Sequence, residues 1–181
     1  AELILAVMML DLIAQYLVHV LLHKIKFMWR FHMVHHSDTA VDVTTGTRHH
    51  PGDFIIRELF ALIAILIFGM PIAFYLIYRI LTVFFTYLTH ANMELPIWID
   101  KTISAVFISP NMHKFHHHFV RPWTDTNFGN IFSIWDRLFG TFVYSDPHKI
   151  QYGLDVTDAD KSDELEYQLK LPFNRNIKTD Y

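Results

Sequence analysis

Short, regular clusters of histidine constrain this chain more than any other feature. His32 begins a run with imidazoles at i, i+3 and i+4, and His113 begins a second run with the same spacing. His19 and His23 form a third cluster at i and i+4. These offsets place side chains on one face of a helix. Because the chain has 13 His and no Cys, the clusters predict a site for more than one metal ion.

The composition favours a membrane protein. Of 181 residues, 52% are hydrophobic and only 18% are charged, a balance typical of chains with lipid-facing helices. The net charge of −3 and the lack of a Lys or Arg run argue against a nucleic-acid partner. Without cysteine, the sequence excludes disulfides, thiolate zinc sites and iron–sulfur clusters.

The apolar runs predict three long helices. Residues 3–22 have the length of one membrane span. As a single helix, residues 54–89 would extend about 54 Å, which is too long for one span. Gly69-Met70-Pro71 interrupts this second run, and proline ends or kinks a helix. We therefore expect one long helix followed by a helical hairpin with arms 54–68 and 71–90.

Charges after the first apolar run indicate its orientation. Lys24, Lys26 and Arg30 mark that end as cytoplasmic by the positive-inside tendency. We expect both apolar blocks to place their histidine-bearing ends on this side, under a helical cap. Because the chain starts at Ala1 inside an apolar run, we expect a fragment without its N-terminal membrane helices. The expected organisation is a single domain over 1–181, with an acidic tail over 155–181.

Polar residues inside the first apolar run form a single stripe. Asp11, Gln15, His19 and His23 follow one another at intervals of four residues. In one interpretation, Asp11 and Gln15 orient the two metal-binding histidines by hydrogen bonds to their rings. In the other, Asp11 only pairs with a neighbouring helix. The sequence leaves both open.

The number of imidazoles narrows the chemistry. Nine well-placed histidines are too many for one ion but enough for two ions that each keep an open position. Haem needs only two axial ligands, and no cluster contains the Glu of an H-E-x-x-H hydrolase. Two irons beside a lipid phase could instead reduce dioxygen and attack a C–H bond. We expect His118 to point away from the metal and His148 to lie outside the site.

The motifs taken in order resemble the fatty acid hydroxylase/sterol desaturase superfamily of integral-membrane di-iron oxygenases. Besides the histidine clusters, the resemblance rests on Arg48-His49-His50-Pro51, His90-Ala91-Asn92, Asp125-Thr126-Asn127-Phe128-Gly129 and Trp135-Asp136-Arg137-Leu138-Phe139-Gly140-Thr141. It implies an all-α fold and two iron ions bound by His19, His23, His32, His35, His36, His90, His113, His116 and His117. His50 matches a recurrent family histidine whose role is open, and Val20 stands where the family often has Arg.

The resemblance also implies an activity. It predicts hydroxylation of a C–H bond in a sterol, fatty acyl or related apolar lipid, with dioxygen as co-substrate. Electrons would come from an external donor of cytochrome b5, ferredoxin or reductase type. The alternatives are a desaturase or an ether-cleaving monooxygenase at the same site, or a non-catalytic zinc- or iron-binding membrane protein. The expected location is the cytoplasmic membrane of a bacterium or the endoplasmic reticulum of a eukaryote, with the site facing the cytoplasm.

Overall fold

A computed structural model describes residues 1–119, 121–145 and 149–179. Over these residues it contains helices and loops, with one isolated bridge between Phe107 and Phe132 and no strand. The expected all-α class is confirmed.

The first helical segment runs from Glu2 to Lys24 without interruption. It comprises α1 (Glu2–Leu10), the π-helical stretch η1 (Asp11–Leu17) and α2 (Val18–Lys24). Its length and apolar character are sufficient to cross a membrane. The long helix predicted from the sequence is therefore present.

The predicted hairpin is also present, with a slightly earlier start. Its arms are α4 (Pro51–Phe68) and α5 (Ile72–His90). Pro51 occupies the first turn of α4, where a missing N–H costs nothing, and the His50 side chain caps the helix by accepting from the Gly52 N–H. Gly69 ends α4 in the left-handed conformation at φ 59°, which favours glycine. Of the two arms, α5 is long and apolar enough to span a membrane.

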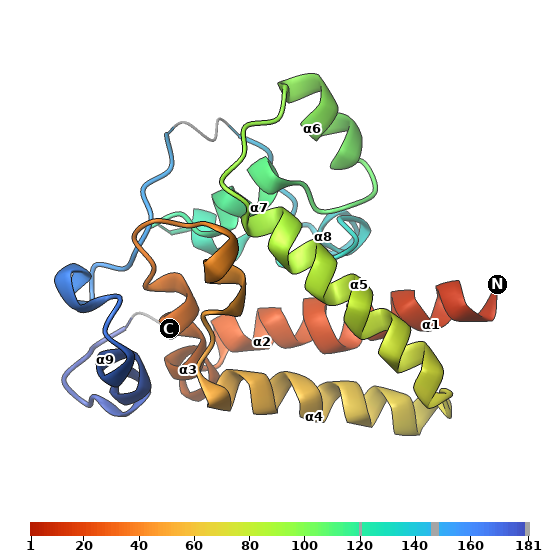
Figure 1. Cartoon of the computed structure of the whole chain (residues 1–181), viewed down its shortest axis with the longest axis horizontal. Coiled ribbons are helices and arrows are strands. Elements are labelled where there is room, and N and C mark those ends of the chain that lie inside the picture. The colour runs from red at the N-terminus through yellow and green to blue at the C-terminus, as the bar shows by residue number, and fades with distance from the viewer. Residues whose placement is uncertain (120, 146–148, 180–181) are drawn as a thin grey trace.

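The two arms of the hairpin, α4 and α5, each pack on the first helical segment, and small residues lie at these contacts. Figure 1 shows the N-terminus and the α4–α5 turn at one end of the molecule, with α2 leading to the opposite end. Ala14, Ala61 and Ala64 are buried in a cluster with Leu10 and Tyr78. Small side chains let helix backbones approach closely in a membrane. The end of α2, the start of α4 and the end of α5 consequently converge on the same region.

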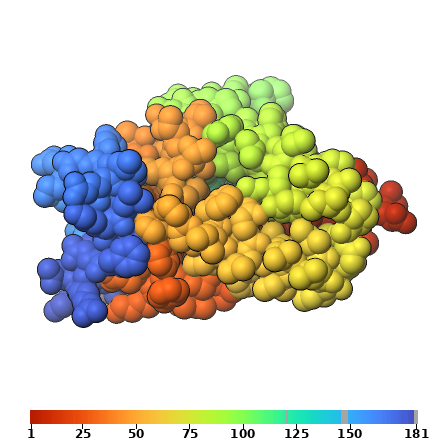
Figure 2. Space-filling view, turned by 60° about the horizontal axis from the view of Figure 1, so that its bottom comes forward, coloured from red at the N-terminus to blue at the C-terminus, as the bar shows by residue number. Residues whose placement is uncertain are grey.

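The outer faces of the hairpin are apolar and exposed. Figure 2 presents α4 (yellow) and α5 (yellow-green) on one face, between the blue C-terminal segment and the red N-terminus. The exposed side chains include Ile55, Leu59, Leu62, Leu66, Ile67, Leu76, Ile80 and Phe84. An apolar surface of this extent is typical of helices that contact lipid.

Shorter helices and loops cover the histidine-bearing end. They are α3 (Lys26–His36), η2 (Val43–Thr47), α6 (Ile97–Ile103), α7 (Pro110–His116), η3 (Trp123–Asp125) and α8 (Ile134–Phe139). The C-terminal segment adds η5 (Ala159–Lys161), α9 (Leu165–Lys170) and η6 (Leu171–Phe173). Most residues from 155 to 166 are exposed, as expected for an acidic tail. The residues after them pack on α3, where Leu171 is buried with Trp29 and Met33.

Asp11 fastens the first helix to the segment that precedes α8. Its carboxylate accepts hydrogen bonds from the Ile131 and Phe132 N–H groups, both at 3.2 Å, and from Trp135 Nε1 at 2.9 Å. In the described part of the chain these bonds go to that segment and not to a histidine. The interpretation in which Asp11 orients His19 or His23 is therefore wrong, and the pairing interpretation describes its role.

The substitution Asp11→Ala is expected to destabilise the fold. It would leave three buried N–H donors without an acceptor, at a cost of about 3 kcal/mol or more. The midpoint of thermal unfolding in detergent should fall by roughly 6–12 °C. Asp160→Ala, at an exposed carboxylate in the C-terminal segment, serves as the control and should shift the midpoint by no more than about 2 °C. Equal midpoints for the two variants would contradict the assigned role of Asp11.

Candidate metal centre

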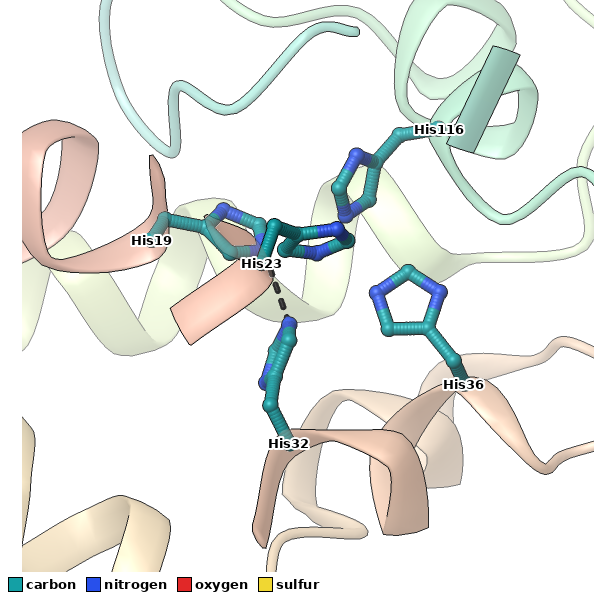
Figure 3. A group of neighbouring side chains, drawn as sticks. All are labelled: His19, His23, His32, His36 and His116. Carbon is teal, nitrogen blue, oxygen red and sulfur yellow. Dashed lines mark hydrogen bonds between the residues drawn. The ribbon is translucent and has the colours of Figure 1, made fainter. Parts of the chain in front are cut away.

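All nine histidines predicted as ligands lie in one of two adjacent groups. The ring nitrogens of the first group lie within 4.8 Å of one another, and its members are His19, His23, His32, His36 and His116. Figure 3 shows these five rings pointing toward a common space. The second group meets the same distance limit and contains His35, His90, His113 and His117. The rings of His36 and His117 stack at 4.7 Å and join the two groups.

The two groups divide each histidine cluster between them. On α3, His32 and His36 are one turn apart and face the first group, whereas His35 faces the second. On α7 the first histidine of the cluster, His113, enters the second group, and His116 enters the first. His117 follows α7 directly, with a φ of −78° and a ψ of 9°. Because it lies one helical turn after His113, its ring enters the same group as that of His113.

Main-chain carbonyls set the tautomer of four of these rings. In each case Nδ1 lies at hydrogen-bond distance from a carbonyl oxygen, which can only accept, so Nδ1 carries the proton. The pairs are His19 with Phe128 at 2.7 Å, His35 with Thr45 at 3.0 Å, His90 with Thr86 at 2.7 Å and His116 with Thr126 at 2.7 Å. The Nε2 lone pair of each ring is therefore available inside its group, as in metal-binding histidines.

The Trp135–Thr141 motif has a structural explanation in this arrangement. The Asp136 carboxylate accepts from the Phe128 N–H at 2.7 Å and the Gly129 N–H at 2.9 Å. A Cβ at Gly129 would lie 2.7 Å from the Phe132 carbonyl oxygen, so the close turn requires glycine. Asp136 thereby positions the loop whose carbonyl oxygens hold His19 and His116.

The donor set fits bound metal ions. His32 Nδ1 donates to Asp53 at 2.6 Å, so its Nε2 is unprotonated, and it faces the unprotonated Nε2 of His19 at 2.9 Å. His35 and His90 repeat this arrangement, with Nε2 atoms 3.3 Å apart. Such lone pairs repel one another unless a cation lies between them. Two nitrogens bound to one ion at about 2.1 Å and at right angles are about 3.0 Å apart, which matches these spacings.

Burial keeps the cap histidines in the neutral form that binds metal. It lowers the pKa of His32 to about 4, even though the Asp53 carboxylate opposes the shift. Burial, reinforced by neighbouring imidazoles, also lowers the pKa well below the usual 6.5 for His35, His36, His113, His116 and His117. In addition, Nε2 of His36 and Nε2 of His116 are buried without a hydrogen-bond partner in the described chain. The neutral imidazole is the form that binds metal, so these rings fit a metal site.

Asp53 is a central residue that the sequence reasoning missed. Its fully buried carboxylate accepts from His32, from His49 Nδ1 at 3.2 Å and from Arg57 Nε at 2.8 Å. Arg57 in turn donates to the Gln15 side chain at 2.9 Å. Gln15 therefore reaches a candidate ligand indirectly, through Arg57 and Asp53. The available signal was an acidic residue at the start of an apolar run, three residues after His50.

The other histidines occupy distinct positions. His49 stacks on His35 with ring centroids 4.3 Å apart and lies beside the second group; the sequence reasoning did not select it. His50 caps α4 and packs against Phe31 and Phe173, away from both groups. His118 is half-buried, contacts the Phe115 ring and belongs to neither group, as expected. His148 lies outside the described residues.

A cavity of about 470 Å³ opens between α4 and α5 and reaches the histidines. At one end it is lined by His35, His90 and His113 of the second group, whereas His19 alone contributes from the first. Phe54, Val83, Thr82, Thr86 and Tyr87 line the part between the arms. The volume lies within the range of sites that hold small organic molecules.

Sequence comparisons agree with this geometry. The family model described as "Fatty acid hydroxylase" matches residues 3–141. An ornithine lipid hydroxylase of Rhizobium tropici is 31% identical over 88% of this chain and 47% of its own length. Alkylglycerol monooxygenases are 29% identical in Caenorhabditis elegans, over 70% of this chain and 24% of theirs, and 25% identical in Homo sapiens, over 77% and 30%.

The chain thus spans less than half the length of these curated relatives. No solved structure matches it. The family model nevertheless covers all nine grouped histidines and ends at Thr141, the last residue of the Trp135–Thr141 motif. The chain belongs to the fatty acid hydroxylase family.

Proposed function

We propose that this chain carries the active site of an oxygen-dependent lipid hydroxylase with two iron ions. The observation that supports the proposal is the pair of adjacent imidazole groups, the second of which lines one end of a largely apolar cavity. The balanced reaction consumes a C–H bond, dioxygen, two electrons and two protons, and yields a C–OH bond and water. The chain's relatives are named as lipid hydroxylases and monooxygenases.

The nine grouped histidines would hold the two ions. Iron, when bound, supplies the reduction of dioxygen and the oxidation of the C–H bond. The protein contributes fixed tautomers: carbonyl oxygens and Asp53 hold the Nδ1 protons, so the Nε2 atoms stay turned inward. Phe54 and Val83 give the cavity an apolar wall that favours a hydrocarbon segment over water.

The apolar faces of α4 and α5 support delivery of the substrate from a bilayer. The cavity lies between these two helices, so a lipid in the membrane could enter sideways without crossing water. We further propose that the histidine-bearing end faces the cytoplasm, on the basis of Lys24, Lys26 and Arg30. An external protein would supply the electrons there.

Ether cleavage is the second candidate, since several relatives are named alkylglycerol monooxygenases. Hydroxylation of the carbon next to an ether oxygen gives a hemiacetal, which breaks into an alcohol and an aldehyde. The same site could therefore serve both outcomes, depending on the lipid bound.

Lipid analysis of cells that express the protein tests the activity. Under ¹⁸O₂, a hydroxylase is expected to yield a lipid that is absent from control cells and carries one labelled oxygen atom. An ether-cleaving enzyme would instead yield a labelled aldehyde or its alcohol. Cells that express the doubly substituted His36→Ala/His117→Ala protein provide the control. Identical lipid profiles in the presence of a competent electron donor would refute the proposed activity.

Metal analysis tests the ligand set. Mildly purified protein is expected to contain two ions per chain, with iron in the active form, because the histidines form two separate groups. Inductively coupled plasma mass spectrometry measures this directly. One ion or none in active protein would contradict the proposal. Zinc after overexpression would not, because imidazole sites accept the commoner metal.

His116, at the end of α7, and His118, two residues later, allow a candidate ligand to be compared with a histidine outside the groups. His116→Ala is expected to lower activity by more than about 100-fold and to reduce metal content, because it removes a buried donor. His118→Ala should keep both metal and most activity, because its ring lies outside the groups. The two variants serve as matched controls for each other. Equal loss of metal in both would show that the assignment on this helix is wrong.

A further inference from the structure

One stripe of α5 forms the long wall of the cavity. Its lining residues are Arg79, Thr82, Val83, Thr86, Tyr87 and His90, which follow the spacing of a single helix face. Arg79 and His90 are 11 residues apart, so they lie about 16 Å apart along the helix axis. The cavity is therefore an elongated slot with the second histidine group at one end and Arg79 at the other.

The two arginines that line this slot are each neutralised by a carboxylate. Arg79 pairs with Glu58 at 3.1 Å, and Tyr75 donates to the same carboxylate. Arg57 pairs with Asp53 at 2.8 Å. The slot therefore offers N–H donors without an excess positive charge. A carboxylate or phosphate would gain little from such a wall, whereas an uncharged oxygen could accept a hydrogen bond from it.

Arg57 is the better placed of the two donors. Its side chain is only 13% exposed, and Asp53 and Gln15 fix the guanidinium plane through Nε and Nη1. Nη2 makes no hydrogen bond to any described residue, although Arg57 lines the cavity. A donor that faces the cavity can give a hydrogen bond to an atom bound there, so a ligand that supplies an oxygen at this point would gain affinity.

We propose that Arg57 binds an uncharged oxygen of the lipid substrate, of the ester, ether or amide carbonyl class. This inference rests on the proposed function and narrows its substrate. Through Asp53, the same guanidinium is connected to His32, a candidate ligand. The lipid oxygen would thus be held near the histidine end of the slot, with an alkyl chain along the α5 stripe. The oxidised carbon would lie close to the polar part of the lipid.

A binding comparison tests this role without turnover. The probes are 1-O-hexadecylglycerol, the matching ester 1-hexadecanoylglycerol and icosane-1,2-diol, in which a CH₂ group replaces the ether oxygen. Palmitate is the charged comparison. Binding to the purified metal-loaded protein is measured without oxygen, by native mass spectrometry. The wild type is expected to bind the ether or the ester about tenfold more tightly than the diol, the contribution of one hydrogen bond to a charged donor.

The variants Arg57→Gln and Arg57→Lys should bind the diol as the wild type does but lose the preference for the oxygen. Arg137→Gln is the matched control, because Arg137 contacts Ser104 and Phe142, away from the cavity, and it should keep the preference. Metal content and circular dichroism verify that each variant is folded. Arg57→Gln could lower the metal content, because Arg57 holds Asp53 and Asp53 holds the candidate ligand His32. In that case Arg57→Lys is used for the comparison, because it keeps a positive charge beside Asp53.

Three outcomes would overturn the proposal. They are a wild type without a preference for oxygen, a preference that survives both Arg57 variants, and a stronger affinity for palmitate than for the ether and the ester. These outcomes are independent of the activity. A preference lost in the Arg57 variants, with no lipid oxidation in cells, would sustain the role of Arg57 and reject the hydroxylase. Lipid oxidation in cells, combined with no binding preference for the ether or ester oxygen, would sustain the hydroxylase and reject the role of Arg57.

Discussion

The structure depends on bringing unprotonated imidazole nitrogens to within about 3 Å of one another. The Nε2 atoms of His19 and His32, at 2.9 Å, and of His35 and His90, at 3.3 Å, face each other without a proton between them. Such contacts are unfavourable without a cation, so the fold must hold them in place. The nine imidazoles that meet there come from α2, the end of α5, and the cap helices α3 and α7 with the residue that follows α7.

Three buried carboxylates fix the segments around the histidines through hydrogen bonds. Asp11 binds backbone N–H groups near α8, and Asp136 binds those of Phe128 and Gly129. Asp53 instead binds His32 and Arg57. Each carboxylate is fully or almost fully buried and surrounded by donors, which offsets the cost of its desolvation. Asp11 and Asp136 thus hold the segment from Phe128 to Phe132, whereas Asp53 holds the His32 ring directly.

The two histidine groups have different surroundings. The second group contributes three histidines to the cavity wall, whereas the first contributes only His19. On its other side the first group contacts Trp29, whose ring centroid is 5.0 Å from that of His23 and which packs against Leu171 of the C-terminal segment. A lipid in the slot would therefore approach the second group more directly than the first.

The helices and the break at Gly69 followed from the sequence alone, because hydrophobic period and proline act locally. The histidine spacing together with the family resemblance selected the nine grouped histidines, including the isolated His90. Asp53, Arg57 and His49 did not, because a carboxylate or histidine near a helix start has many possible partners. The allocation of His35 and His36 to different groups also needed the fold. Adjacent residues on a helix point about 100° apart. The positions of α2, α5 and α7 around α3 then decide which of the two histidine groups each ring enters.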